Sequence, residues 1–338
     1  QFKYAAWAAY AQDEWRVNRD LVLTLGLRYD YLTQPKTIDG RLWNSLDLPN
    51  KRWIIGATEM PPLCSVAQQA PCIPDAFLTD PHFNDVVLAG KKFFAPPPVK
   101  DNWGPRIGVA WTINPKTVLR AGYGLYWDAL PARSQYAQND LEQSVWPDAT
   151  AFSGNANATA NFANGTQANI IQIQGQGFAV PLPTTNPWGV GGFGDDPKYK
   201  DGYSQQWHVQ IQRQLSQNMM FTAAYVGSKN GRLPYSGLAN AARQASPNGT
   251  SNAVVDALRQ MPWISATVNY TLSEGYSNYN ALETSLQRRF SKGLQTLVSY
   301  TWGKSIDVSS GYFNVENGFG GSSSIQNFYD KSTARGVS

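Results

Sequence analysis

Residues 20–32, DLVLTLGLRYDYL, alternate between large apolar side chains and small or polar ones. One set of alternate positions is apolar: Leu21, Leu23, Leu25, Leu27, Tyr29 and Tyr31. The set between them is Val22, Thr24, Gly26, Arg28 and Asp30. This period of two predicts a β-strand with one apolar face and one small or charged face. The predicted strand is about twice as long as the usual strand of a globular protein.

The same alternation recurs in seven more segments: 4–17, 103–113, 117–128, 203–215, 219–229, 279–290 and 294–304. The segments come in pairs, and each pair is joined by a few turn-forming residues such as Asn18-Arg19-Asp20 or Asn114-Pro115-Lys116. Such links predict antiparallel hairpins. Long segments separate or follow the pairs, at about 34–102, 129–202, 230–278 and 306–338. Connections of this length are uncommon in a compact soluble domain.

Alternation of short turns with long connections places all the turns at one end of the sheet and all the long loops at the other. That asymmetry is typical of outer-membrane barrels, which have short periplasmic turns and long extracellular loops. We therefore predict an all-β fold, an antiparallel transmembrane β-barrel segment of about eight strands. The apolar face would meet lipid and the other face a wet lumen. The alternative is a soluble β-sandwich, which would bury the apolar face and use shorter strands.

Composition narrows the class of protein. The 338 residues carry a formal charge of +4, with 15% charged and 13% aromatic residues. Lys and Arg do not cluster, so we do not expect a nucleic-acid partner. No apolar run reaches the length of a membrane-spanning helix. The sequence begins without an initiator Met or a recognisable signal peptide, and we expect it to be a fragment of a longer protein.

Cys64 and Cys72 lie in a Pro-rich segment within 34–102. Their spacing is too wide for a CxxC redox or zinc motif, and His82 is the only nearby histidine. We therefore expect no metal site. A disulfide that closes a small loop would indicate an extracytoplasmic location. Two free thiols are the alternative.

The sequence offers no catalytic or cofactor-binding constellation. GxSxG is absent. GVGGFG at 189–194 matches a dinucleotide-binding fingerprint in form, but it lies in a predicted loop with no strand before it and no helix after it. Asp195, Asp196 and Asp201 are interpreted as a solvated cluster rather than a calcium site.

Four stretches resemble consecutive barrel hairpins of TonB-dependent outer-membrane receptors, nearest to the Oar-like subgroup. They are YAQDEWRVNRDLVLTLGLRYDY, DNWGPRIGVAWTINPKTVLRAGYGLYWD, YSQQWHVQIQRQLSQNMMFTAAYVGSKNGRLP and YSNYNALETSLQRRFSKGLQTLVSYTWGKSID. The resemblance implies a 22-stranded barrel filled by an N-terminal plug and energised through TonB. The plug, the TonB-contacting segment and the closing C-terminal strand have no counterpart in this sequence. We therefore expect a curved, open sheet with two unpaired edges, or a small closed barrel.

The alternation places several polar side chains on the lumen face: Glu14, Arg28, Asp30, Arg106, Arg120, His208, Glu283 and Arg289. We interpret them first as plug contacts, and alternatively as the lining of a transport path. Trp146 and Trp188 in the long loops are candidate substrate contacts. Alternatively, they fold the loops back on themselves.

The resemblance implies a receptor in the outer membrane of a Gram-negative type bacterium that binds a substrate at the cell surface and imports it, with no catalytic role and no cofactor. Its partners would be outer-membrane lipid, the TonB complex through the missing plug region, and a substrate. For this subgroup an oligosaccharide or peptide is favoured over a siderophore. The alternatives are a passive porin-like or a secretion and adhesion barrel, and a soluble carbohydrate-binding β-protein.

Overall fold

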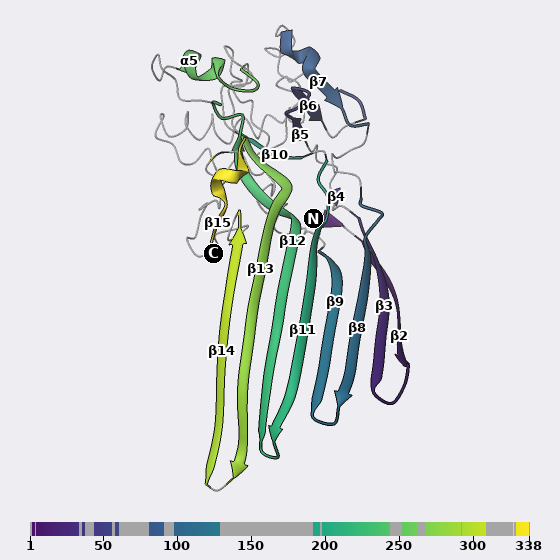
Figure 1. Cartoon of the computed structure of the whole chain (residues 1–338). Helices are drawn as coiled ribbons and strands as arrows, with labels where there is room; N and C mark the ends of the chain where they lie inside the picture. Colours follow the sequence, from purple (N-terminus) through teal and green to yellow (C-terminus); the bar gives the residue numbers. More distant parts are fainter. Residues whose placement is uncertain are drawn as a thin grey trace, which may run out of the picture.

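The computed structural model describes residues 2–3, 5–33, 36–37, 44–55, 58–60, 81–90, 98–128, 192–196, 198–243, 252–262, 268–291, 293–308, 327 and 329–337. One sheet dominates this part of the chain (Figure 1). None of the described helices is long and apolar enough to cross a membrane.

Four antiparallel hairpins build the main sheet. Their strands are β2 (Ala6–Arg16), β3 (Leu21–Leu32), β8 (Trp103–Asn114), β9 (Thr117–Asp128), β11 (Gly202–Ser216), β12 (Met219–Ala239), β13 (Val268–Ser291) and β14 (Leu294–Asp307). Each hairpin also pairs antiparallel with the next, so the strand order runs from β2 to β14 without a crossover. The predicted all-β class and its eight long strands are confirmed. Within the described residues the sheet is open, with β2 at one end and the short β15 (Gly336–Val337) beside β14 at the other.

The remaining elements are short and belong to the connections. They are β1 (Phe2–Lys3), β4 (Lys36–Thr37), β5 (Asn44–Asp47), β6 (Arg52–Ile55), η1 (Pro81–Asp85), β7 (Val86–Leu88), β10 (Gly192–Asp195), α5 (Asn252–Ala257) and η3 (Lys331–Ala334). β10 runs parallel to the start of β13. The segment that resembles a dinucleotide fingerprint is therefore partly a strand, which the alternation did not predict.

Two strands continue well beyond their predicted ends. β12 extends to Ala239 and β13 begins at Val268, so about half of the connection predicted at 230–278 is sheet. The pairing register of β12 with β13 shifts on either side of Leu233, and Arg232 has a positive φ of 55°. An irregularity of this kind breaks the alternation of side chains, which explains why the sequence pattern ended there.

The hairpin turns all lie at one end of the sheet, and the short elements of the connections lie at the other (Figure 1). Asparagine side chains close two of the turns. Asn18 Oδ1 accepts a hydrogen bond from the amide of Asp20 at 2.8 Å, and Asn114 Oδ1 accepts one from Lys116 at 3.0 Å. Such bonds mimic a backbone turn and favour a short link.

The sheet has two chemically different faces. Paired residues of an antiparallel ladder share a face, so the register defines an apolar face that carries Leu23, Val109, Val209, Leu282 and Trp302. Large apolar side chains on this face are open, with Leu25 50%, Trp103 51% and Trp302 69% exposed. No layer covers them in the described structure. Extended apolar surface of this kind marks a membrane or protein contact.

The largest buried side chains of the described residues lie at the loop end, whereas the buried residues within the long strands are small, such as Ala224 and Ala281. The largest fully buried ones are Tyr199, Tyr270 and Met261, and Leu48 is also buried. Gln260 Nε2 donates to the carbonyl of Leu48 at 2.7 Å and links two connections that lie far apart in the sequence. The packed interior of this chain is therefore a cap at the loop end of the sheet.

Asn240 holds part of this cap together. The residue is fully buried with a φ of 55°. Its Oδ1 accepts a hydrogen bond from the amide of Met261 at 2.8 Å, and its Nδ2 donates to the Met261 carbonyl at 3.2 Å. Arg259 Nη1 donates to the Asn240 carbonyl at 2.7 Å. Asparagine suits this position because it tolerates the left-handed conformation.

We expect Asn240→Ala to loosen the cap locally. The change removes two buried hydrogen bonds of about 1 kcal/mol each and leaves Met261 backbone groups unpaired. Hydrogen exchange at the Met261 amide should therefore accelerate about thirtyfold, as measured by mass spectrometry on the full-length protein. Asn84→Ala, which removes one exposed hydrogen bond to Pro81, is the matched control. Unchanged exchange at Met261 would contradict this account of the cap.

Candidate functional site

The polar face of the sheet carries the charged side chains that the alternation selected. Arg28 and Asp30 lie two positions apart on β3 and form an ion pair, with Arg28 Nη2 2.9 Å from Asp30 Oδ1. Arg28 Nε also donates to both carboxylate oxygens, at 3.0 and 2.9 Å. Arg120 Nη1 donates to Gln212 on the neighbouring strand. These two arginines are therefore satisfied within the sheet.

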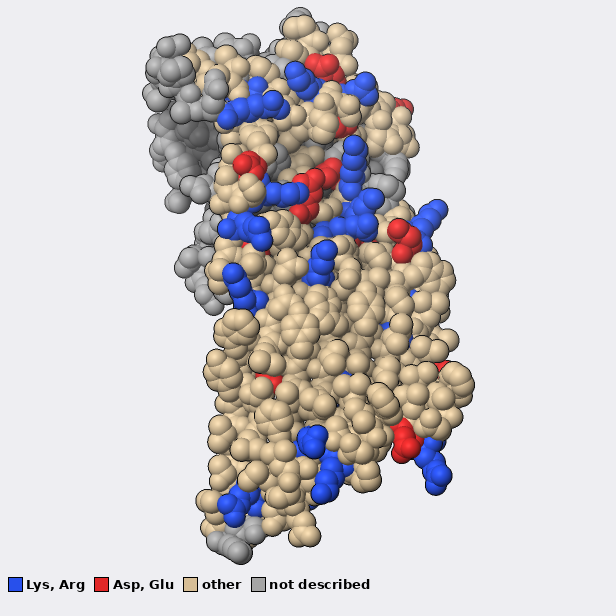
Figure 2. Space-filling view, viewed as in Figure 1, with Lys and Arg blue, Asp and Glu red and all other residues tan. Residues whose placement is uncertain are grey.

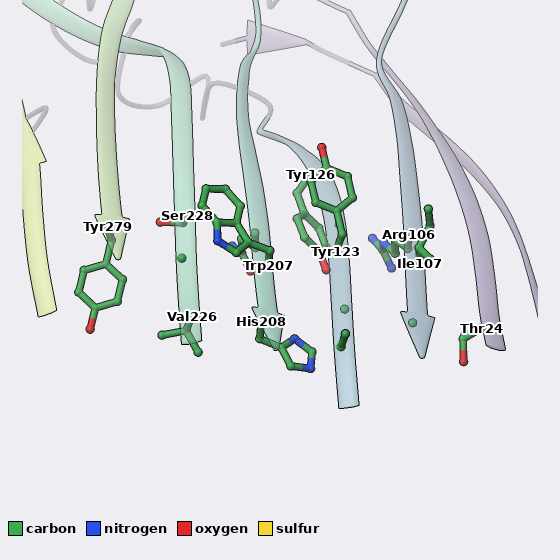
Figure 3. Close-up of a pocket in the computed structure, with 16 residues that line it drawn as sticks. Thr24, Arg106, Ile107, Tyr123, Tyr126, Trp207, His208, Val226, Ser228 and Tyr279 are labelled. Atoms are coloured by element: carbon green, nitrogen blue, oxygen red, sulfur yellow. The ribbon is translucent and has the colours of Figure 1, made fainter. Parts of the chain in front are cut away.

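A shallow pocket of about 640 Å³ lies at the centre of this face (Figure 3). Glycines form its floor: Gly108, Gly122 and Gly124. Aromatic rings lie against this floor, because a Cβ at Gly122 would stand 2.6 Å from the His208 ring and one at Gly124 would stand 2.6 Å from the Tyr126 hydroxyl. A larger residue at either position would have to displace the ring that lies against it.

Arg106 forms one wall of the pocket. Its guanidinium carbon lies 4.8 Å from the centre of the Tyr126 ring, which is cation–π geometry. Arg106 Nε is buried and has no hydrogen-bond partner among the described residues. A buried donor without an acceptor is costly. The opposite side of the pocket is polar and aromatic, with Gln206, Ser228 and Tyr279.

The predicted lumen residues are only partly brought together. Arg106 and His208 line one pocket. The register places Glu14 opposite Thr24, at the edge of the same face, and Glu283 opposite Ala224. Arg289 follows near the turn end of β13, where a smaller pocket lies. Cys64, Cys72, Trp146 and Trp188 lie outside the described residues, so their predicted roles stay predictions.

Sequence reasoning missed the uncharged members of the pocket. Tyr126 and Tyr279 alternate with small or polar residues, and neither carries a charge that marks it as a lumen residue. The available signal was the pattern in 122–126, GYGLY, in which glycines alternate on the face that also carries Tyr126. Glycine in a strand often marks a place where another group approaches the backbone closely.

A second polar cluster lies where β8 and β11 begin, and it corrects the interpretation of the acidic loop. Asp201 is only 2% exposed, and its Oδ2 accepts a hydrogen bond from Asn102 Nδ2 at 2.7 Å. Asn102 is fully buried and its Oδ1 has no partner among the described residues. Asp201 is therefore not part of a solvated cluster, because a contact 99 positions away in sequence buries it. Asp196 instead closes a turn by accepting from the Lys198 amide.

Burial raises the pKa of the Asp201 carboxyl above its usual value. The neighbouring Asp128 and Asp101 add to this effect, while the Asn102 hydrogen bond and Arg232 oppose it. In the described part of the chain, no group of three or more His, Cys, Asp or Glu side chains could hold a metal ion, and this includes the carboxylates around Asp201. On the polar face, the rings, amide and hydroxyl groups that line the pocket are suited to binding by stacking and hydrogen bonds.

The sequence matches the outer membrane beta barrel domain family over residues 1–338. The chain belongs to this family. Its apolar face is accordingly the lipid-facing wall, its polar face lines the lumen, and its location is the outer membrane of a Gram-negative type bacterium. The membership decides against a soluble carbohydrate-binding protein. A search of curated proteins finds no match.

Solved structures that are similar to this chain are outer-membrane proteins. They include the outer membrane transporter YddB from Escherichia coli, with 11% identity and a TM-score of 0.43 over 91% of this chain and 25% of that one. A ferric enterobactin receptor from Pseudomonas aeruginosa has 11% identity and a TM-score of 0.42 over 90% of this chain and 26% of that one. The FrpB iron transporter from Neisseria meningitidis has 12% identity and a TM-score of 0.38 over 89% and 26%. The chain thus spans about a quarter of the length of these barrels.

We expect Asp201→Asn to change how stability depends on pH. Since the folded state raises the pKa of this carboxyl, folding binds its proton more tightly, and the wild type gains stability as pH falls through the raised value. Asparagine can still accept the hydrogen bond from Asn102 but does not titrate, so the variant should lack this gain. Urea unfolding of the full-length protein in detergent at several pH values measures it.

Two control variants complete this test. Asp20→Asn removes an exposed carboxylate at a hairpin turn and should keep the wild-type pH profile. Asp201→Ala deprives buried Asn102 Nδ2 of its acceptor and should cost about 1–3 kcal/mol at every pH. If Asp201→Asn and the wild type show the same pH profile, the burial of this carboxyl does not control stability.

Proposed function

We propose that this chain is part of the barrel wall of a TonB-dependent receptor of the Oar-like type. The receptor binds a substrate at the cell surface and imports it through a 22-stranded barrel filled by a plug. Membership of the outer membrane beta barrel domain family supports the setting, and the resemblance of the four hairpins supports the type. No catalytic step is part of this proposal.

One observation carries the proposal: the lumen face presents a buried arginine donor that has no hydrogen-bond partner among the described residues. The donor is Arg106 Nε, for which the described part of the chain offers no acceptor, whereas Arg28 and Arg120 on the same face are paired. A folded plug inside the barrel would supply the acceptor. A water-filled pore would leave this surface hydrated.

The substrate in this proposal is an oligosaccharide or peptide rather than an iron chelate, and Trp146 and Trp188 of the long loops contact it. TonB acts through the plug region of the full-length protein. The lumen residues Glu14, Glu283 and Arg289 join Arg106 and His208 as plug contacts by hydrogen bonds and ion pairs.

Conductance distinguishes a plugged receptor from a passive pore. We expect the full-length protein in a planar lipid bilayer to show no steady current until urea displaces the plug. Arg106→Ala should lower the urea concentration at which current appears, because a hydrogen bond to a charged group contributes about 1.5–3 kcal/mol.

Arg213→Ala is the matched control, since its position pairs with Phe221 on the lipid-facing wall. This variant should keep the wild-type urea threshold. A large steady current without urea would replace the proposal with a porin-like barrel. If both variants show the same urea threshold, Arg106 does not contact the plug, but the proposal that a plug fills the barrel stands.

A further inference from the structure

On the lipid-facing wall, the residue type found eleven positions after the hairpin turn differs between strands. On β9, the eleventh residue after the turn is Trp127. The indole of Trp127 donates to the Trp103 carbonyl at 2.9 Å and stacks edge-on against Tyr203, with centroids 5.9 Å apart. Trp103 in turn contacts Tyr29 with centroids 4.6 Å apart. This aromatic row marks the upper membrane interface.

On β12 and β14 the eleventh residue after the turn is a lysine. These are Lys229 and Lys304, and both are exposed. The register places Lys229 opposite Asn278 and Lys304 opposite Asn280, on the same face as Trp302 and Leu282. The two lysines thus flank β13, and each stands as many residues from its turn as Trp127 does on β9.

The two lysines are close enough to share one ligand. They stand two strands apart and are offset by two residues along the sheet. Strand spacing and rise then put their Cα atoms about 12 Å apart, a span that two extended lysine side chains can close from either side. On the view of Figure 2, Lys and Arg are sparse over the middle of the strands and gather toward the two ends.

The groups between the lysines are hydrogen-bond donors. Tyr225 donates its hydroxyl hydrogen to Asn280 Oδ1 at 2.6 Å, which leaves the Asn280 amide nitrogen as a donor. The indole of Trp207 lies against Gly227, the residue paired with Asn280. Neither lysine has an ion-pair partner in the described part of the chain. Of the nearby cations, Lys331 pairs with Glu274, and Arg232 lies over the Trp127 and Tyr203 rings.

An exposed lysine at the lipid-facing interface that has no carboxylate partner on the protein is available to an anionic group of the membrane. We propose that Lys229, Lys304 and Asn280 form a site for the phosphate groups of an anionic lipid head group in the outer leaflet. Phosphate oxygens accept from ammonium and amide donors together, and the apolar surface below holds the acyl chains. The site lies on the outer wall and does not depend on the proposed import function.

Native mass spectrometry of the full-length protein in detergent tests this site. The probes are bisphosphorylated lipid A, the same lipid without phosphates, and inorganic phosphate. We expect the wild type to retain the bisphosphorylated lipid preferentially. Lys229→Gln or Lys304→Gln should weaken retention about fivefold each, and the double variant about thirtyfold.

Lys116→Gln removes a lysine at the opposite, turn end of the barrel and should retain the lipid as the wild type does. Heat-modifiable migration on gels confirms that each variant is folded. Equal retention by the double variant and the wild type would overturn the site. Equal binding of inorganic phosphate and lipid would overturn the assignment to a head group, and equal retention of the lipid without phosphates would show that the acyl chains alone bind.

Discussion

Pairing of backbone hydrogen bonds is the constraint on which this structure depends. Unpaired amide and carbonyl groups are expensive in hydrocarbon, so a chain that crosses the membrane as strands must pair each strand on both sides. The four hairpins form one continuous antiparallel ladder from β2 to β14, in which every strand between these two is paired on both sides. The pairing register then decides which side chains face lipid and which face the lumen, because paired positions share a face and successive positions along a strand do not.

A barrel wall is one sheet thick and has no second layer to bury its side chains. Its side chains therefore pack against residues of neighbouring strands in the same sheet. Both faces use the same device, in which a ring lies over a glycine of the next strand. On the lipid side a Cβ at Gly227 would stand 2.6 Å from the Trp207 indole, and on the lumen side the His208 ring lies over Gly122 in the same way. Glycine weakens an isolated strand, but here it provides the space in which a large ring gains contact.

Alternation predicted the fold well and the site only in part. Period two identified all eight long strands and the face of Arg28 and Asp30, because those features depend on neighbours in sequence. The upper parts of β12 and β13 were missed where register shifts at Leu233 interrupt the period. The burial of Asp201 was missed because Asn102, far away in sequence, causes it. The pocket around Arg106 was not predicted, because it depends on glycines and on Tyr126, which are uncharged.

Alternation along one strand also separates the residues that contact lipid from those that face the lumen. Lys229 faces lipid, while its neighbours Ser228 and Asn230 share the lumen face, where Asn230 Nδ2 donates to Ser277 Oγ at 2.8 Å. A substitution at one position therefore changes the membrane contact and leaves the lumen intact, as long as the register holds. A slip by one residue would exchange the faces of the whole strand. On β12 the register shifts at Leu233, four residues after Lys229, so the faces of the strand from the turn to Lys229 are undisturbed.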